Sequence, residues 1–255
     1  MNLDQSLSFL PETDKNVVAV LSGGLDSSIM TMLLVRKYGA DRVKAVSFDY
    51  GQKQKLELQK AVALCSLLQV EHSVLDLRIL GEIAKPMSAN ISGTSIAMPT
   101  IQDVLGQPRP ETYVPNRNMI MYSIIAAKAE VIGADHVFCG LQVHDEYSYH
   151  DCTQKWVNKM NSVLSENRIT QIKISAPFSH LSKFEEIKIC EEMGMLHLLN
   201  NTLTCYNPND AGESCGKCPS CSERIMNFAK AGMRDPITYA VNIPWERLIG
   251  SVSPK

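Results

Sequence analysis

The sequence predicts an α/β protein with a parallel sheet and helices on both of its faces. The first observation is that short β-branched runs alternate with segments of helical periodicity within the first 80 residues. The second is size, because 255 residues, 45% of them hydrophobic, can bury a large core in one or two domains. Parallel strands joined by helical crossovers account for the alternation, and their two helical layers bury the core.

The first crossover units follow one another closely. A strand is expected at 17–21, followed by the glycine-containing loop 22–28 and then by apolar residues at helical spacing. A second strand at 43–48 leads to a helix ending near residue 68, in which apolar residues recur three and four positions apart. A third strand fits 72–77. These strands would lie side by side in the sheet.

The middle of the chain has weaker patterns. Residues 78–113 show no sustained period and contain four prolines, which predicts a long excursion of the kind that is often functional. A buried helix over 119–132, closed by Gly133, precedes a short strand over 136–139. A second break in the pattern covers 140–151. The sheet is therefore expected to continue beyond a long interruption.

The last third begins with a short strand at 172–174. Ser182 and Glu185 then form a capping box at the start of a helix. From Thr202 onward cysteine, glycine and proline dominate, and a short final helix is expected over 224–231. This change in composition predicts a separate C-terminal subdomain.

Charge and hydropathy restrict the class of function. Lys and Arg number 25 against 27 Asp and Glu, and the formal net charge of -2 argues against direct nucleic-acid binding. No apolar stretch approaches the length of a membrane span. The start of the chain lacks a basic segment followed by an apolar run, so we expect no secretory signal and a cytoplasmic protein. A small-molecule substrate is the better expectation.

The loop Ser22–Ser28 has the chemistry of a phosphate site. It places two glycines and three serines between a strand and a helix, where free backbone N–H groups meet the positive end of the helix dipole. It lacks the lysine of a P-loop and the third glycine of a dinucleotide-binding loop, so a pyrophosphate group is expected. The alternative is a simple turn capped by Asp26 or Ser27.

Four cysteines near the C-terminus have metal-ligand spacing. Cys205, Cys215, Cys218 and Cys221 form C-x₉-C-x₂-C-x₂-C, which predicts a tetrahedral Zn²⁺ site. An iron–sulfur cluster is the weaker alternative, because the x₃-C-P ending of bacterial ferredoxins is missing. Four protein ligands leave no open position, so the metal would be structural. We therefore expect an α/β domain over 1–200 and a zinc-binding subdomain over 201–255 packed on it.

The loop and the cysteines together carry a family resemblance. Ser-Gly-Gly-Leu-Asp-Ser after the first strand resembles the PP-loop of the N-type ATP pyrophosphatase superfamily, with its adenine nucleotide alpha hydrolase-like fold. With the cysteine cluster, the chain resembles the QueC family of 7-cyano-7-deazaguanine synthases. Further matching segments are Phe48-Asp49-Tyr50-Gly51-Gln52, Tyr113-Val114-Pro115-Asn116-Arg117-Asn118, Tyr149-x-Asp151-Cys152, Ala176-Pro177-Phe178, Lys183, Thr204-Cys205-Tyr206 and Arg224.

This resemblance implies a reaction. A member of the family is a ligase of queuosine biosynthesis that forms C–N bonds. It uses ATP to convert 7-carboxy-7-deazaguanine and ammonia to 7-cyano-7-deazaguanine, through an adenylated acid, an amide and an adenylated amide. The implied cofactors are ATP, Mg²⁺ and Zn²⁺, and the implied assembly is a homodimer.

The resemblance also implies site residues. The ATP phosphates would be held by Leu21, Ser22, Gly23, Gly24, Leu25, Asp26, Ser27 and Ser28. The substrate would be bound by Asp49, Tyr50, Gln52, Arg117, Asn118, Tyr149 and Asp151. Catalytic roles fall to Asp26, Arg117 and Lys183, with Asp151 a candidate for orienting ammonia.

Two departures from the family pattern lie in segments that are expected to bind the substrate. Lys53-Gln54 stands where the family has Arg-His, and the segment 145–153 lacks a glycine, a proline and an arginine of the usual loop. One alternative is therefore a relative that stops at the amide, or that adenylates a different acid or a nucleobase acceptor. A relative that transfers sulfur would need a reactive cysteine near the loop, and Cys139 and Cys152 are the candidates. A non-enzymatic binding module is the remaining alternative.

Overall fold

A five-stranded parallel sheet forms the centre of the computed structural model, which describes residues 2–98, 111–141 and 150–251. The strand order is β3-β2-β1-β4-β5. The strands are β1 (Asn16–Val20), β2 (Val43–Asp49), β3 (Glu71–Asp76), β4 (Ala134–Phe138) and β5 (Lys173–Ser175). Every predicted strand is present, with ends displaced by at most two residues. The predicted α/β class is confirmed.

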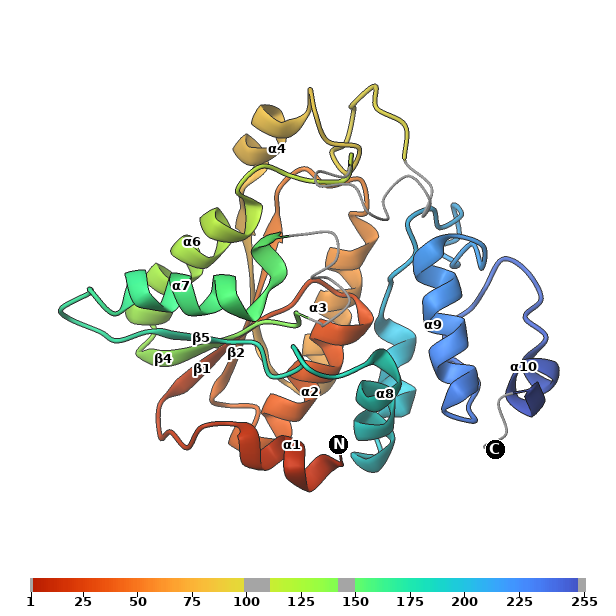
Figure 1. Cartoon of the computed structure of the whole chain (residues 1–255), viewed down its shortest axis with the longest axis horizontal. Coiled ribbons are helices and arrows are strands. Elements are labelled where there is room, and N and C mark those ends of the chain that lie inside the picture. Colours follow the sequence, from red (N-terminus) through yellow and green to blue (C-terminus); the bar gives the residue numbers. More distant parts are fainter. Residues whose placement is uncertain (1, 99–110, 142–149, 252–255) are drawn as a thin grey trace.

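Helices cover both faces of the sheet, as Figure 1 shows. One side carries α2 (Leu25–Tyr38), α3 (Leu56–Leu68), α8 (Lys183–Glu192) and η3 (Leu196–Asn201), and the other carries α6 (Arg117–Val131) and α7 (Gln154–Leu164). Alternate strand residues explain the two layers. Val17 and Ala19 are buried in the first cluster, whereas Val18 is buried in the second.

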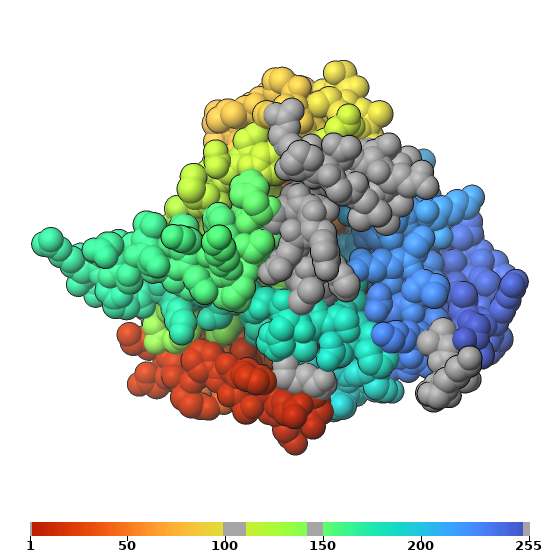
Figure 2. Space-filling model, viewed as in Figure 1, coloured from red at the N-terminus to blue at the C-terminus, as the bar shows by residue number. Residues whose placement is uncertain are grey.

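The C-terminal region adds α9 (Pro219–Lys230), which packs beside α8, and α10 (Trp245–Ser251), which lies beside α9. Phe228 of α9 is fully buried in the same cluster as Ile29 and Leu33 of α2. In the space-filling view the C-terminal residues and the α8 region form one continuous surface (Figure 2). The core is therefore shared between the α/β part and the cysteine-rich part.

Several short elements differ from the sequence prediction. The predicted last helix begins earlier, at Pro219, because the Cys218 side chain caps it by accepting from Cys221 N. Helices that were not predicted are α1 (Leu3–Phe9), α4 (Arg78–Ala84), α7 and α10. Those of seven residues contain too few turns to show a clear period. The Thr153 cap and the buried Val157, Met160 and Leu164 could have indicated α7.

The irregular excursion predicted over 78–113 is wrong at its start, where α4 forms, and agrees with the structure over 85–98, whereas 99–110 lie outside the described residues. The η2 turn (His150–Cys152) leads into α7. None of the helices in the described ranges combines the length and apolar character needed to cross a bilayer.

The strand order places a topological switch point between β1 and β4. Chain connections leave β1 toward β2 on one side, and β4 lies on the other. Ligands of open parallel sheets bind at such a point, outside the carboxyl ends of the strands. The loop after β1 and the segment Cys139–Leu141 after β4 meet there, where a Cβ on Gly140 would lie 3.0 Å from the backbone of Ser27.

Candidate functional site

The loop after β1 has a backbone that only glycine can adopt. Gly23 has φ +91°, and a Cβ on it would lie 2.0 Å from the carbonyl oxygen of Glu57 in the first turn of α3. Gly24 is the N-cap of α2 and provides no side-chain cap. The turn capped by Asp26 or Ser27 is therefore not observed. The first N–H groups of α2 remain available to an anion.

Serine side chains fix the loop internally. Ser22 N donates to Ser27 Oγ at 3.2 Å, and the two hydroxyls lie 3.0 Å apart. Gly24 N donates to Ser22 Oγ at 3.2 Å, and Ser28 Oγ donates to the Gly24 carbonyl at 2.6 Å. These bonds hold the loop in the conformation that exposes its backbone donors.

Asp26 and Lys183 meet beside the loop. Lys183, the first residue of α8, lies 3.4 Å from one carboxylate oxygen of Asp26 and 3.3 Å from Glu223 of α9. The other oxygen, Oδ1 of Asp26, is buried with no hydrogen-bond partner in the described part of the chain. An anionic oxygen of this kind is suited to a divalent cation that also contacts phosphates.

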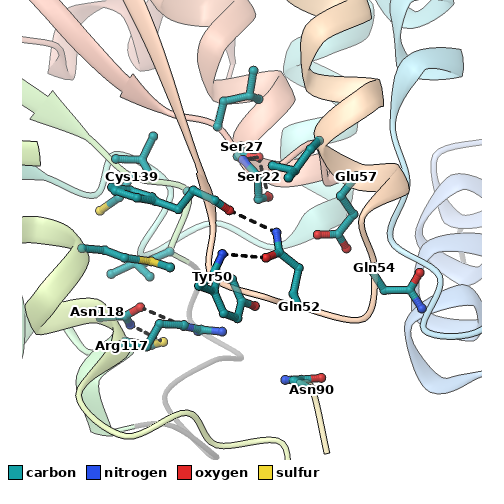
Figure 3. A pocket seen from close by; sticks show the side chains of 18 of the residues that line it. Ser22, Ser27, Tyr50, Gln52, Gln54, Glu57, Asn90, Arg117, Asn118 and Cys139 are labelled. Atoms are coloured by element: carbon teal, nitrogen blue, oxygen red, sulfur yellow. Dashed lines mark hydrogen bonds between the residues drawn. The ribbon is translucent and has the colours of Figure 1, made fainter. Parts of the chain in front are cut away.

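A cavity of about 370 Å³ opens next to the loop, at the carboxyl ends of β1, β2 and β4 (Figure 3). It is lined by Val20, Leu21, Ser22, Ser27, Phe48, Tyr50, Gln52, Lys53, Gln54, Glu57, Leu58, Asn90, Arg117, Asn118, Met121, Tyr122, Cys139, Gly140, Leu141, Cys152 and Tyr206. Such a volume suits a small molecule, and the serines place the phosphate loop in its wall.

Four of the predicted substrate residues line this cavity, namely Tyr50, Gln52, Arg117 and Asn118. Gln52 is held by two bonds, because its side chain accepts from Tyr50 N at 2.9 Å and donates to the Phe48 carbonyl at 3.1 Å. Asn118 accepts from Arg117 Nε at 3.4 Å and donates to the Asp151 carbonyl at 3.1 Å. These polar side chains are positioned before any ligand binds.

The other three predicted substrate residues are placed differently. Asp49 does not line the cavity, because its carboxylate accepts from Gly51 N at 3.0 Å and forms the turn after β2. Asp151 is buried in η2 and does not line it either. Tyr149 lies outside the described residues.

Arg117 supplies a half-buried positive charge to the cavity. Its guanidinium carbon lies 5.9 Å from the centre of the Tyr50 ring. Burial by itself lowers the pKa of Arg117, but the neighbouring Tyr50, Cys152 and Asp151 raise it overall, so the guanidinium remains charged. A partly buried, permanently charged guanidinium is suited to a carboxylate or phosphate.

Sequence reasoning missed several cavity residues, of which Glu57 is the most polar. It lies in the first turn of α3, where an acidic residue usually just complements the helix dipole. Burial raises the pKa of Glu57 to about 8, although the charge of Arg117 opposes this shift. Cys139 was considered only for sulfur transfer, and burial raises the pKa of its thiol to about 11. A thiol in this environment is a poor nucleophile.

The four predicted metal ligands converge. The sulfur atoms of Cys205, Cys215, Cys218 and Cys221 all lie within 4.8 Å of one another. Two of these pairs are 3.9 and 4.0 Å apart. Sulfurs around a tetrahedral Zn²⁺ with bonds of about 2.3 Å would be about 3.8 Å apart, so the cluster has the dimensions of a metal site.

Backbone N–H groups reinforce the metal-binding character of the cluster. Cys205 Sγ accepts from Asn207 N at 3.3 Å and from Cys215 N at 3.2 Å. Cys218 Sγ accepts from Cys221 N at 3.4 Å. Such donors stabilise thiolates, which are the form that binds metal.

The cysteine cluster is connected directly to the loop after β1. Leu203 N donates to the Gly23 carbonyl at 2.9 Å, two residues before the predicted ligand Cys205. Tyr206, the next residue after this ligand, lines the cavity, and its carbonyl accepts from the Gln54 side chain. The segment 203–206 therefore joins the metal ligands, the loop and the cavity wall.

The family model and the curated relatives agree on one family. A family model described as queuosine biosynthesis protein QueC matches residues 16–232. A 7-cyano-7-deazaguanine synthase of Caldicellulosiruptor bescii is 35% identical over 228 residues, covering 89% of this chain and 99% of the relative. That of Oceanobacillus iheyensis is 36% identical over 230 residues, with the same coverage. Among solved structures, NMN synthetase from Francisella tularensis matches with a TM-score of 0.47 and 17% identity, covering 98% of this chain and 90% of that chain.

Proposed function

The chain belongs to the QueC family, and on this premise we propose that it is an enzyme that uses ATP to convert 7-carboxy-7-deazaguanine and ammonia to 7-cyano-7-deazaguanine. The reaction class is that of a C–N ligase, as the names of the curated relatives indicate. The observation that carries the proposal is the glycine–serine loop after β1 in the wall of a cavity that also contains the half-buried, charged Arg117.

The proposed chemistry begins with activation of a carboxylate. The substrate carboxylate attacks the α-phosphate of ATP, and pyrophosphate departs against the N–H groups at the start of α2. Ammonia then displaces AMP and gives the amide. A second ATP activates the amide oxygen, and loss of AMP leaves the nitrile. Arg117 would balance the negative charge of the carboxylate and of the adenylate.

The residues beside the loop fit a magnesium ion held with the nucleotide. The unpaired Oδ1 of Asp26 offers one ligand oxygen, and phosphate oxygens and water would supply the others. Mg²⁺ would neutralise phosphate charge. Lys183, already 3.4 Å from Asp26, would stabilise charge on the departing pyrophosphate.

The four cysteines fit Zn²⁺ in a structural role. All four are protein ligands, so the site keeps no open position for substrate. We propose that residues 201–255 form the zinc-binding subdomain and that residues 1–200 form the α/β domain. The family resemblance further supports a cytoplasmic homodimer that acts on a small molecule rather than directly on nucleic acid.

Purified protein incubated with 7-carboxy-7-deazaguanine, ATP and ammonium tests the proposal. Mass spectrometry should show the nitrile, together with AMP and pyrophosphate. Accumulation of the amide would instead identify a relative that stops halfway, which the departures at Lys53 and Gln54 would then explain. ADP and orthophosphate as products would refute the proposed cleavage of ATP.

A further inference from the structure

Glu57 directs a carboxylate into the cavity close to the phosphate loop. Its carbonyl oxygen occupies the space where a Cβ of Gly23 would lie, so the first turn of α3 packs directly on the loop. Figure 3 shows the Glu57 side chain entering the cavity on the side of Ser22 and Ser27. Groups that react with the α-phosphate must meet at this end of the cavity. Glu57 is therefore placed near the reacting centre rather than at the far wall.

The Glu57 carboxylate is available to a ligand. In the ranges that the structure describes, no hydrogen-bond donor contacts it, and Arg117 is the charged group that opposes its protonation. The other charged or titratable side chains that line the cavity are Tyr50, Lys53, Tyr122, Cys139, Cys152 and Tyr206. Gln52 and Gln54 are already engaged in bonds to backbone groups. Glu57 is thus the one carboxylate among the described lining residues.

We propose that Glu57 binds the ammonium ion, takes one proton from it to give ammonia, and accepts the second proton that nitrogen loses in forming the amide. This inference rests on the proposed function. The nitrogen lone pair forms the new C–N bond at the acyl carbon of the adenylated acid. Glu57 first releases the proton taken from ammonium to solvent, and the N–H proton lost after attack then passes to its carboxylate oxygen. The C–O bond to AMP breaks, and the phosphate oxygen of AMP keeps the electron pair.

The same residue can act in the second half of the reaction. Loss of AMP from the adenylated amide gives the nitrile when the remaining N–H proton leaves and its electron pair completes the triple bond. Glu57 accepts that proton after it has returned both protons from amide formation to solvent. A carboxyl group that is desolvated inside a cavity is a stronger base than an exposed one, and a pKa of about 8 matches proton transfer near neutral pH.

The other acidic candidates are less suitable. Asp151, expected from the sequence to orient ammonia, is buried in η2 and does not line the cavity. Asp26 lies against Lys183, where its carboxylate is paired with a positive charge. Neither carboxylate is directed at the space that the adenylated acid would occupy.

The test separates activation of the acid from attack by nitrogen. In E57Q, which keeps the shape of the side chain, acid-dependent exchange of pyrophosphate into ATP is measured without ammonium. We expect it to stay within about threefold of the unchanged protein. The value of kcat/KM for ammonium should fall by about 10²-fold or more, the usual contribution of a general base. E57D, which keeps a carboxylate, should recover part of this loss.

Hydroxylamine supplies a readout that a purely structural role would not change. It is less basic than ammonia and largely unprotonated at neutral pH, so its attack depends less on a proton acceptor. We expect E57Q to form the hydroxamate with a much smaller loss than the amide. Glu130→Gln, a change at an exposed position of α6, is the matched control and should leave both reactions unchanged.

Three results would overturn the inference. An unchanged kcat/KM for ammonium in E57Q would show that the carboxylate is not needed. Equal losses in pyrophosphate exchange and in amide formation would show that Glu57 serves ATP or acid binding instead. If the unchanged protein produces no AMP from the acid and ATP, the proposed function itself fails, and the role of Glu57 in it fails for that separate reason.

Discussion

Gly23→Ala should destabilise the protein far more than an ordinary replacement of glycine. Gly23 has φ +91°, and the new Cβ would lie 2.0 Å from the Glu57 carbonyl oxygen. Real Cβ contacts are essentially never closer than 3.0 Å, so the first turn of α3 must retreat by about 1 Å. Holding alanine at this positive φ lowers the free energy of unfolding by about 1 kcal/mol. The forced displacement of packed backbone adds about 1 to 3 kcal/mol.

Gly133→Ala is the matched control. Gly133 has φ +68°, but nothing lies within 4 Å of the Cβ position, so only the cost of the backbone conformation remains. Urea unfolding followed by circular dichroism measures both variants. With an m-value of about 2.5 kcal/mol/M, the midpoint should fall by about 1 M for G23A and by about 0.4 M for G133A. ATP binding, measured by calorimetry, should be lost only in G23A. Equal midpoints would refute the steric reasoning.

Three further outcomes are expected. Cys218→Ser should lose bound metal, measured by emission spectrometry. Its melting temperature should also fall, because metal binding contributes to the free energy of folding. An unchanged melting temperature would exclude a structural metal. Arg224→Ala leaves the buried Asp235 carboxylate without a cation, with Tyr239 and Ile237 N still donating to it, and should lower the free energy of unfolding in urea by about 3 to 5 kcal/mol. Arg234→Ala, at an exposed ion pair, should lower the free energy of unfolding by less than about 1 kcal/mol. Similar losses in Arg224→Ala and Arg234→Ala would contradict this difference. Finally, folding raises the pKa of Glu57 from 4.5 to about 8, so the folded state keeps this proton up to a higher pH than the unfolded state does. The free energy of unfolding should therefore fall as the pH rises from about 4.5 to about 8. Between pH 5 and pH 8 the urea midpoint of E57Q should fall less than that of the unchanged protein. Parallel profiles of midpoint against pH in the two proteins would contradict the raised pKa of Glu57.

The sheet could be predicted from the sequence because β-branched runs fill both of its faces. Val17 and Val18 point to opposite layers, and both are fully buried. The glycine–serine loop and the cysteine cluster could also be singled out, since their residue types lie close together along the chain. The four cysteine sulfurs converge as a metal site requires, and the environment of Gly23 explains the glycine of the loop, while phosphate and metal binding stay predictions.

The cavity was less predictable because its wall is assembled from distant segments. Glu57 follows β2, and Cys139 follows β4, and only the parallel register brings them to one edge of the sheet. Asp49 was expected to contact the substrate, but it lies at the turn after β2, where its carboxylate satisfies Gly51 N. Local pattern identifies a polar residue at a strand end, but it does not tell whether the side chain serves the turn or the cavity.

The bond between Leu203 and Gly23 also has a consequence for biosynthesis of the protein. The loop near the start of the chain obtains one of its supports from a segment 180 positions later. While the ribosome is still translating, a nascent chain that lacks this segment has a phosphate loop without that support. Nucleotide binding should therefore develop late, after most of the polypeptide has emerged, and a prematurely terminated product should not sequester ATP.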